Sequence, residues 1–149
     1  MDTDTLRVSA YFIVKNAAAA IDFYRAAFDA EEIFRMTDPV DGRVGHAELR
    51  FGQTVMMIAD EYPDFGALSP DTIGGSPVTF HLATTSTDQM LARAMAAGAV
   101  LLRAPTDQSY GERVAMILDP FGHKWMLSQT IEKVPPKEMQ RRWEAETKA

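Results

Sequence analysis

The sequence predicts an α+β fold built from two βαβββ modules whose curved mixed sheets surround a shared concave cavity. A strand-then-helix pattern occurs twice along the chain, and each occurrence is followed by short strands, two of them joined by a Gly-containing turn. The length of 149 residues fits one compact domain spanning 1–149, and the 46% hydrophobic content is enough for a substantial core. Each expected element follows from a local pattern.

The first module is expected over about residues 5–60. Its opening stretch is apolar and β-branched, and Asn16 then precedes a segment with apolar residues at helical spacing. The expected elements are a strand over Leu6–Val14, a helix over AAAAIDFYRAAF, a short strand over Glu32–Arg35, and a hairpin of Arg43–Phe51 and Thr54–Ala59 about Gly52-Gln53.

Residues 61–76 are rich in Pro, Gly, Ser and Asp, which is typical of a linker. The second module is expected over about residues 77–130. Its elements are a strand over Val78–Thr84, a helix over Thr87–Ala97 ended by Gly98, a short strand over Val100–Arg103, and a hairpin of Arg113–Leu118 and Lys124–Gln129. The tail over residues 135–149 predicts a charged helix, with Trp143 as its packing residue.

The two modules form an internal repeat. FYRAAFDAEEIFR and LARAMAAGAVLLR share helix-then-strand character, and LRFGQTVMM and ILDPFGHKWML each place a Gly turn between strands. The offset between the copies is roughly 70 residues, which indicates one structural unit used twice.

Composition limits the classes of function. The formal net charge of −6 and the isoelectric point of about 5.0 argue against partners such as nucleic acid or an anionic membrane. The absence of cysteine excludes disulfides, thiolate metal sites and a Cys nucleophile. The N-terminal MDTDTLRV lacks an apolar signal segment and no apolar run is long enough to span a bilayer, so a cytoplasmic location is expected.

Strand alternation predicts which side chains face the cavity. On the strand over Arg43–Phe51, we expect His46, Glu48 and Arg50 to share the cavity face, with Ala47 and Leu49 on the helix-covered face. On the other strands, the expected cavity-facing sets are Ser9, Tyr11 and Ile13; Thr79, His81 and Ala83; and Lys124, Met126 and Ser128. A register shift of one residue would invert these assignments.

Several of these residues are candidate ligand contacts. His46 and Glu48 share a strand face, so they could form an acid–base pair, bind a metal together with His81, or simply be polar residues bonded to neighbours. Tyr110, in the loop YGER, could stack on a flat ligand or pack against its own loop. The nine methionines could line an adaptable apolar pocket or fill the core.

The chain resembles the vicinal oxygen chelate superfamily, which includes glyoxalase I, bleomycin-resistance proteins and extradiol dioxygenases. The resemblance is to the PhnB-like branch and covers most of the chain. It is carried by the stretches AAAAIDFYRAAFDAEEIFRM, GHAELRFGQTVMMIADE, GGSPVTFHLATTSTD, YGERVAMILDPFGHKW and PPKEMQRR. It implies paired βαβββ modules and often a homodimer.

The resemblance also implies four positions for a divalent metal. They fall on Ser9, on Met56 or Met57, on His81 and on Met126. Of these only His81 is a suitable ligand, because hydroxyl and thioether groups bind Zn, Mg, Mn or Fe(II) poorly. His123, in DPFGH, falls outside this set and is expected to be a hydrogen-bonding turn residue.

Two functions remain open. The first is a small-molecule-binding protein of the glyoxalase/bleomycin-resistance type with no metal cofactor and with Tyr11, His46, Glu48, His81, Tyr110 and Met126 as candidate ligand contacts. The alternative is a metal-dependent lyase, isomerase or dioxygenase whose divalent metal is held by relocated ligands at His46, Glu48 and His81. An interaction module without a ligand is a third reading, and the sequence does not decide whether the protein is an enzyme.

Overall fold

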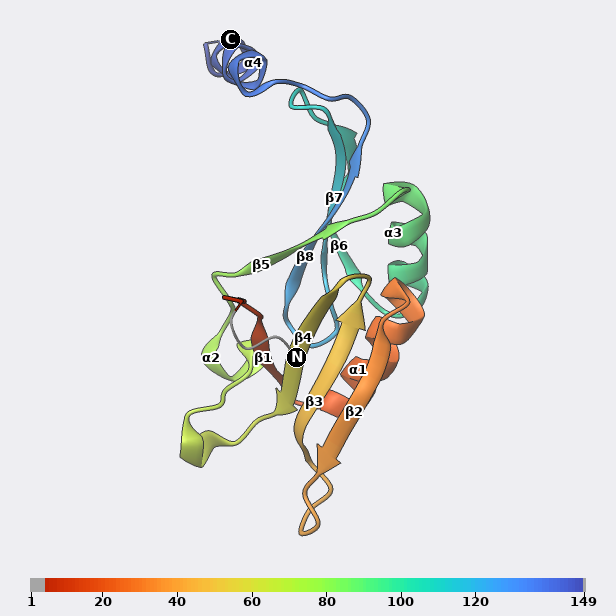
Figure 1. The fold of residues 1–149 in the computed structure, drawn as a ribbon, viewed down its shortest axis with the longest axis vertical. Helices are drawn as coiled ribbons and strands as arrows, with labels where there is room; N and C mark the ends of the chain where they lie inside the picture. The colour runs from red at the N-terminus through yellow and green to blue at the C-terminus, as the bar shows by residue number, and fades with distance from the viewer. Residues whose placement is uncertain (1–4, 149) are drawn as a thin grey trace. The chain divides into compact units, whose positions relative to one another are not determined.

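The computed structural model describes residues 5–148, which divide between Ser76 and Pro77 into two compact units. Each unit has a four-stranded mixed sheet with a helix packed on one face (Figure 1). The order of elements in each unit is β, α, β, β, β, which confirms the predicted α+β fold of two βαβββ modules.

Unit 1 carries a sheet with strand order β1-β4-β3-β2, in which β1 and β4 are parallel and the other neighbours are antiparallel. Its elements are β1 (Tyr11–Val14), α1 (Ala17–Phe28), β2 (Glu31–Thr37), β3 (Val44–Phe51), β4 (Thr54–Asp60), the 3-10 turn η1 (Pro63–Phe65) and α2 (Pro70–Ile73).

Unit 2 repeats this topology, with strand order β5-β8-β7-β6 and a parallel β5–β8 pair. Its elements are β5 (Thr79–Ala83), α3 (Thr87–Ala96), β6 (Val100–Asp107), β7 (Glu112–Leu118), β8 (Lys124–Thr130) and α4 (Pro136–Thr147).

The last core strand of each unit helps to start that unit's helix. Asp60, at the end of β4, accepts a hydrogen bond from the Ala17 amide through Oδ1 at 2.8 Å. Gln129, on β8, accepts one from the Thr87 amide through Oε1 at 3.1 Å. These contacts supplement the expected N-cap Asn16 and its counterpart Ser86, because the first amides of a helix have no partner within the helix.

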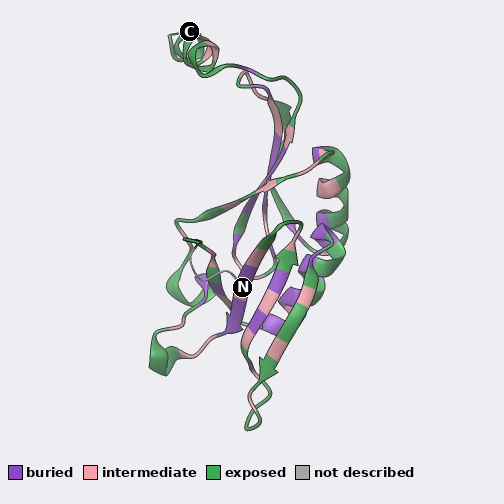
Figure 2. Cartoon of the chain, viewed as in Figure 1, coloured by how far each residue is buried: buried purple, intermediate pink, exposed green. Residues whose placement is uncertain are grey.

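The core of unit 1 lies between α1 and the sheet. Figure 2 shows buried residues on α1 and on alternating positions of the central strands. Ile21 and Tyr24 of α1 and Leu49 of β3 are fully buried, and each such side chain contributes about 1.5–3 kcal/mol. On β3, Ala47 is also buried, whereas His46 and Glu48 are half-buried on the opposite face. The predicted face assignment for β3 is therefore confirmed.

The strand boundaries differ most from the prediction at two places, the start of β1 and the end of β6. β1 begins at Tyr11 rather than Leu6, so Ser9 lies before the strand. β6 continues to Asp107 instead of ending at Arg103, although it contains Pro105. Proline is tolerated there because β6 is an edge strand, and its pairing with β7 is irregular between Arg103 and Thr106.

The segment expected to be a linker contains structure of its own, namely η1 and the single helical turn α2. The Glu61 carboxylate accepts hydrogen bonds from the Ser69 amide at 2.7 Å and from the hydroxyls of Ser69 and Thr72. One carboxylate therefore connects the end of β4 to α2.

The tail forms the expected helix, α4, but Trp143 is not its packing residue, because Trp143 is 60% exposed. Arg142 ties the helix to the rest of unit 2 instead. Its guanidinium donates to the Ser109 carbonyl at 2.8 Å and pairs with Glu132 at 3.0 Å. None of the helices described in residues 5–148 has the length and apolarity needed to cross a bilayer.

Candidate functional site

Three of the predicted site residues meet on the open face of the unit 1 sheet. Tyr11 Oη lies 2.9 Å from His46 Nδ1, and His46 Nε2 lies 3.1 Å from Glu48 Oε2. Tyr11 lies at the start of β1 and the other two on β3, with β4 between these strands, and the tyrosine and imidazole ring centroids are 5.4 Å apart. Strand alternation therefore placed Tyr11, His46 and Glu48 on one face correctly.

The direction of the two hydrogen bonds follows from which groups can donate. An ionised carboxylate can only accept, so in the neutral imidazole Nε2 carries the proton that is donated to Glu48. Nδ1 then accepts the hydrogen bond from the Tyr11 hydroxyl. Burial raises the pKa of Tyr11, which keeps its hydroxyl protonated at neutral pH.

Strand pairing extends this cluster into a row across the sheet. Tyr11 pairs with Met57, Met57 pairs with Glu48, and Glu48 pairs with Phe34. The Phe34 ring lies 5.6 Å from the His46 ring. Of the two methionines left open by the sequence, Met57 is therefore the one on the open face. Met56 pairs with Leu49 and is buried with it on the helix side.

A cavity of 530 Å³ adjoins Tyr11 in unit 1. Its lining residues come from β1, β3, β4 and the segment that follows β4: Tyr11, Ile13, Gly45, Ala59, Asp60, Tyr62, Phe65 and Ala67. The lining is mainly aliphatic and aromatic, with the two tyrosine hydroxyls and Asp60 as its polar side chains. Such a lining is typical of sites for small organic molecules.

Unit 2 carries a second, smaller polar cluster on the corresponding face of its sheet. His81 Nε2 lies 4.0 Å from Glu112 Oε2, and the Ser128 hydroxyl donates a hydrogen bond to the same carboxylate. His81 pairs with Met126, and Met126 pairs with Met116. Met126 and Ser128 therefore share the face of His81, as alternation predicts.

Tyr110 lies in the loop between β6 and β7, two residues before β7 begins, and is 38% exposed. Burial and the charge of Glu112 raise its pKa. Both residues line a cavity of 360 Å³ whose other walls come from the end of β8 and the tail, including Met139. Tyr110 can therefore contact a molecule in that cavity, although charged residues also line it.

The repeat shows which residue of unit 1 corresponds to His81. Tyr11 precedes the first residue of α1 by the same number of positions as His81 precedes the first residue of α3. Tyr11 pairs with Met57 on the parallel neighbour strand, as His81 pairs with Met126. Tyr11, rather than Ser9, therefore occupies the position that the resemblance assigns to the first metal ligand.

These four side chains do not suit the metal of the related enzymes. A phenol that donates to an imidazole and two thioethers are poor ligands for a hard or borderline divalent ion, and one histidine alone holds such an ion weakly. Across residues 5–148 there is no group of three or more His, Asp or Glu side chains arranged to hold a metal. Within unit 1 the suitable pair is His46 with Glu48, and His81 belongs to unit 2.

His123 is a buried residue at the last hairpin. It is 6% exposed, its amide donates to Asp119 Oδ1 at 3.0 Å, and its ring stacks on Phe80 at a centroid distance of 5.6 Å. The prediction of a hydrogen-bonding turn residue is confirmed.

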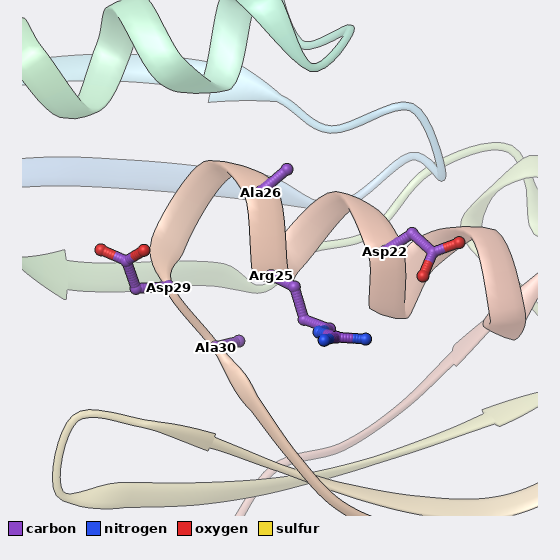
Figure 3. Close-up of a pocket in the computed structure, with 5 residues that line it drawn as sticks. All are labelled: Asp22, Arg25, Ala26, Asp29 and Ala30. Carbon is purple, nitrogen blue, oxygen red and sulfur yellow. The ribbon is translucent and has the colours of Figure 1, made fainter.

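A further hollow of 430 Å³ lies against α1 and the start of the chain leading to β2 (Figure 3). Its lining comprises Asp22, Arg25, Ala26, Asp29 and Ala30. It contains none of the predicted site residues, and its charged side chains are exposed, with Asp22 and Arg25 on the helix and Asp29 at its C-cap.

Two residues of the unit 1 cavity, Tyr62 and Phe65, were missed by reasoning from the sequence. They are aromatic residues within a segment otherwise rich in turn-forming residues, and that contrast was the available signal. The choice between Met56 and Met57 could have been made by continuing the alternation of the paired strand from Leu49.

Comparisons with known proteins place the chain in a family. Residues 7–127 match the family model described as the Glyoxalase/Bleomycin resistance protein/Dioxygenase superfamily. Uncharacterized proteins of Mycobacterium tuberculosis and Mycobacterium bovis are 41% identical over 136 residues, which is 89% of this chain and 79% and 89% of those proteins.

Solved structures show the same fold. A gene product of Arabidopsis thaliana is 26% identical with a TM-score of 0.67, and the match covers 83% of this chain and 98% of that one. A glyoxalase/bleomycin resistance protein/dioxygenase family enzyme from Burkholderia phytofirmans is 20% identical with a TM-score of 0.65, covering 82% and 96%. The PhnB protein of Bacillus cereus is 15% identical with a TM-score of 0.65, covering 84% and 100%.

The matched family model spans both modules, and the two repeated sheets have the topology that the resemblance implies. This chain belongs to the Glyoxalase/Bleomycin resistance protein/Dioxygenase superfamily.

Proposed function

We propose that this protein binds a small organic molecule on the open faces of its sheets and does so without the divalent metal of the related enzymes. The observation that carries this proposal is the identity of four paired residues. Tyr11 and Met57 occupy in unit 1 the positions that His81 and Met126 occupy in unit 2. Three of the four are unsuited to grip a divalent cation.

The same substitutions favour binding of an uncharged or weakly polar molecule. Methionine side chains are flexible and polarisable, so they fit ligands of irregular shape. Tyr11 and Phe34 add aromatic surface beside His46. The polar groups of the cluster supply a few directed hydrogen bonds, which fix orientation in an otherwise apolar site.

The second candidate is a metal-dependent lyase, isomerase or dioxygenase of the superfamily with relocated ligands. The contact between His46 and Glu48 favours it, because an imidazole and a carboxylate are suitable ligands. It is the weaker candidate, since His46 Nε2 and the Glu48 carboxylate would have to give up their mutual hydrogen bond to bind a metal. The metal would also need a third donor beyond the pair that unit 1 supplies.

The proposal includes a homodimer located in the cytoplasm. The resemblance to the PhnB-like branch supports the dimer, and the formal net charge of −6 supports a protein that binds neither nucleic acid nor anionic membranes.

A thermal-shift screen of metabolites and antibiotics, run with and without EDTA, tests the proposal. A ligand that binds the folded state raises the melting temperature, and the shift grows with the ratio of ligand concentration to Kd. We expect at least one neutral organic compound to stabilise the protein equally in both buffers, and His46→Ala or Met57→Ala to reduce the shift. Stabilisation that disappears with EDTA and returns on adding Zn²⁺, Mn²⁺ or Fe²⁺ would instead support the enzyme.

A further inference from the structure

The cavity of unit 1 is closed on one side by the segment that follows β4, and this segment is held firmly. Tyr62 and Ala67 exchange two backbone hydrogen bonds of 3.0 and 3.1 Å, which closes a tight loop. Gly66 allows the turn with a φ of 76°. Phe65 lies at the tip of this loop.

The base of the loop is fixed by contacts with the β2–β3 connection. The Arg43 guanidinium lies 3.9 Å above the Tyr62 ring, and its Nη1 donates to the Glu61 carbonyl at 2.9 Å. The Tyr62 hydroxyl donates to Asp38 Oδ2 at 3.2 Å. The loop is therefore tied on both sides of Phe65 before any ligand arrives, which lowers the entropic cost of binding.

Phe65 is 86% exposed although it belongs to this fixed loop and lines the cavity. Single exposed apolar residues are common on protein surfaces and need no function. Here the aromatic ring stands beside a mostly apolar wall that includes Ile13, Ala59 and Ala67. A flat molecule in the cavity would cover the Phe65 ring and the apolar wall and so remove both of these surfaces from water.

The polar groups of the cavity restrict the charge of that molecule. Asp60 is 7% exposed, and its two carboxylate oxygens already accept from the amides of Ala17 and Val44 at 2.8 and 2.7 Å. Both of its oxygens are therefore satisfied by hydrogen bonds within the protein. A neutral ligand suits these surroundings better than an ion.

Tyr11 supplies the directed polar contact. With the imidazole of His46 neutral and its Nε2 proton donated to Glu48, Nδ1 is an acceptor and receives the Tyr11 proton. The phenolic oxygen keeps lone pairs that accept, but it has no second proton to give. A ligand group that meets this oxygen must therefore be a donor, such as an N–H or O–H.

We propose that the unit 1 cavity selects a neutral, flat aromatic molecule that bears an N–H or O–H donor, with Phe65 as the stacking wall and the Tyr11 oxygen as the acceptor. This assignment rests on the proposed small-molecule function and deepens it by naming the class of ligand. Glu48 and His46 act as positioning residues that set the direction of the Tyr11 hydrogen bond.

The test compares indole with benzofuran, two probes of the same shape of which only indole has an N–H donor. Binding is followed by NMR through the backbone amides of Gly45, Ala59 and Ala67 in the 149-residue chain. We expect indole to bind at least about threefold more tightly than benzofuran, because it alone can donate to Tyr11. Tyr11→Phe should remove this preference and leave benzofuran binding nearly unchanged.

Phe65→Ala should weaken both probes about tenfold, because the stacking surface is lost. Val40→Ala is the matched control, since Val40 is 90% exposed on the same unit but does not line the cavity. It should leave both affinities unchanged. A well-dispersed amide spectrum of each variant shows that the unit remains folded.

Two results would overturn the assignment in different ways. If the probes shift only amides around His81 and Tyr110, the ligand class assigned to unit 1 is wrong while a small-molecule function stands. If neither probe nor any compound of the thermal-shift screen perturbs an amide in either unit, the proposed function fails together with the assignment.

Discussion

The carboxylate of Asp119 accepts a hydrogen bond of 2.9 Å from the indole Nε1 of Trp125, and both side chains are 2% exposed. The other oxygen of Asp119 accepts from the amides of Phe121 and His123 at 2.9 and 3.0 Å. One buried carboxylate therefore shapes the turn between β7 and β8 and fixes the largest side chain in the core of unit 2.

Asp119→Ala should destabilise the protein by about 2–5 kcal/mol, because buried donors lose their acceptor and water cannot easily replace it. Urea unfolding followed by tryptophan fluorescence measures the change. Asp107→Asn is the control, since Asp107 is an exposed residue whose ion pair with Arg113 is screened by solvent and should contribute little to stability. A similar decrease in the free energy of unfolding in the two variants would contradict this description of the turn.

Gly111, the residue after Tyr110, combines a φ of 94° with a close approach to the backbone. A Cβ at this position would lie 2.2 Å from the Glu132 carbonyl oxygen. Gly111→Ala should therefore cost at least about 2 kcal/mol and disturb the contact between this loop and the end of β8.

Gly42→Ala separates the cost of the positive φ at Gly111 from the cost of the close contact with the Glu132 carbonyl. Gly42 has a φ of 80°, and apart from its chain neighbours no atom lies within 4 Å of the place that an alanine Cβ would take. Its substitution therefore carries the backbone cost alone, about 1 kcal/mol. Thermal unfolding of both variants provides the comparison. A loss at Gly42 equal to that at Gly111 would show that the contact with Glu132 is unimportant.

Glu61 should hold the segment between β4 and α2 in a pH-dependent manner. Hydrogen bonds from Ser69 and Thr72 lower the pKa of this carboxyl below its ordinary value of 4.5. The stabilisation is thus present above pH 4.5 and is lost as the pH falls below that value. Glu61→Ala should make residues 62–73 at least about threefold more sensitive to limited proteolysis at neutral pH. Asp64→Ala, on the same segment, is the control expected to leave the rate unchanged.

Glu138 should remain ionised in acid because Arg141 and Arg142 both donate to it. These contacts lower its pKa from 4.5 to about 2. Their contribution to the stability of the α4 helix itself is therefore complete above pH 4.5 and disappears as the pH falls toward 2. A carboxyl NMR titration should give a midpoint near 2 in the unmodified protein and a clearly higher one in Arg142→Gln. An unchanged midpoint in Arg142→Gln would refute the claim that Arg142 lowers the pKa of Glu138. Lys148→Gln is the control, because Lys148 is not among the residues that donate to Glu138.

The sequence was sufficient for those elements whose local patterns agree with their tertiary environment. The helix after Asn16 and both Gly-turn hairpins were predictable because capping, periodicity and turn residues all favour them. The start of β1 was not, since residues 6–10 are apolar enough for a strand but do not belong to one in the structure. The end of β6 was hidden by Pro105, which an edge strand accommodates.

The candidate site was predictable to the extent that it depends on strand alternation. Tyr11, His46 and Glu48 meet because alternation puts them on one face, and the β1–β4–β3 pairing then brings the strands together. That Tyr62 and Phe65 line the unit 1 cavity was not predictable. Their loop, closed by Tyr62 and Ala67, is positioned by tertiary contacts with the β2–β3 connection, and no local pattern reveals those contacts. Counting back from the helix gave Ser9, whereas strand pairing identifies Tyr11.

Metal analysis of the untagged protein tests the central proposal most directly. Protein purified without a His-tag or chelator is measured by inductively coupled plasma mass spectrometry, together with His46→Ala and His81→Ala. We predict far less than one divalent metal per chain and no difference among the three proteins. Near-stoichiometric Zn, Ni, Mn or Fe that is lost in either variant would contradict the proposal and restore a metal-dependent reaction as the function.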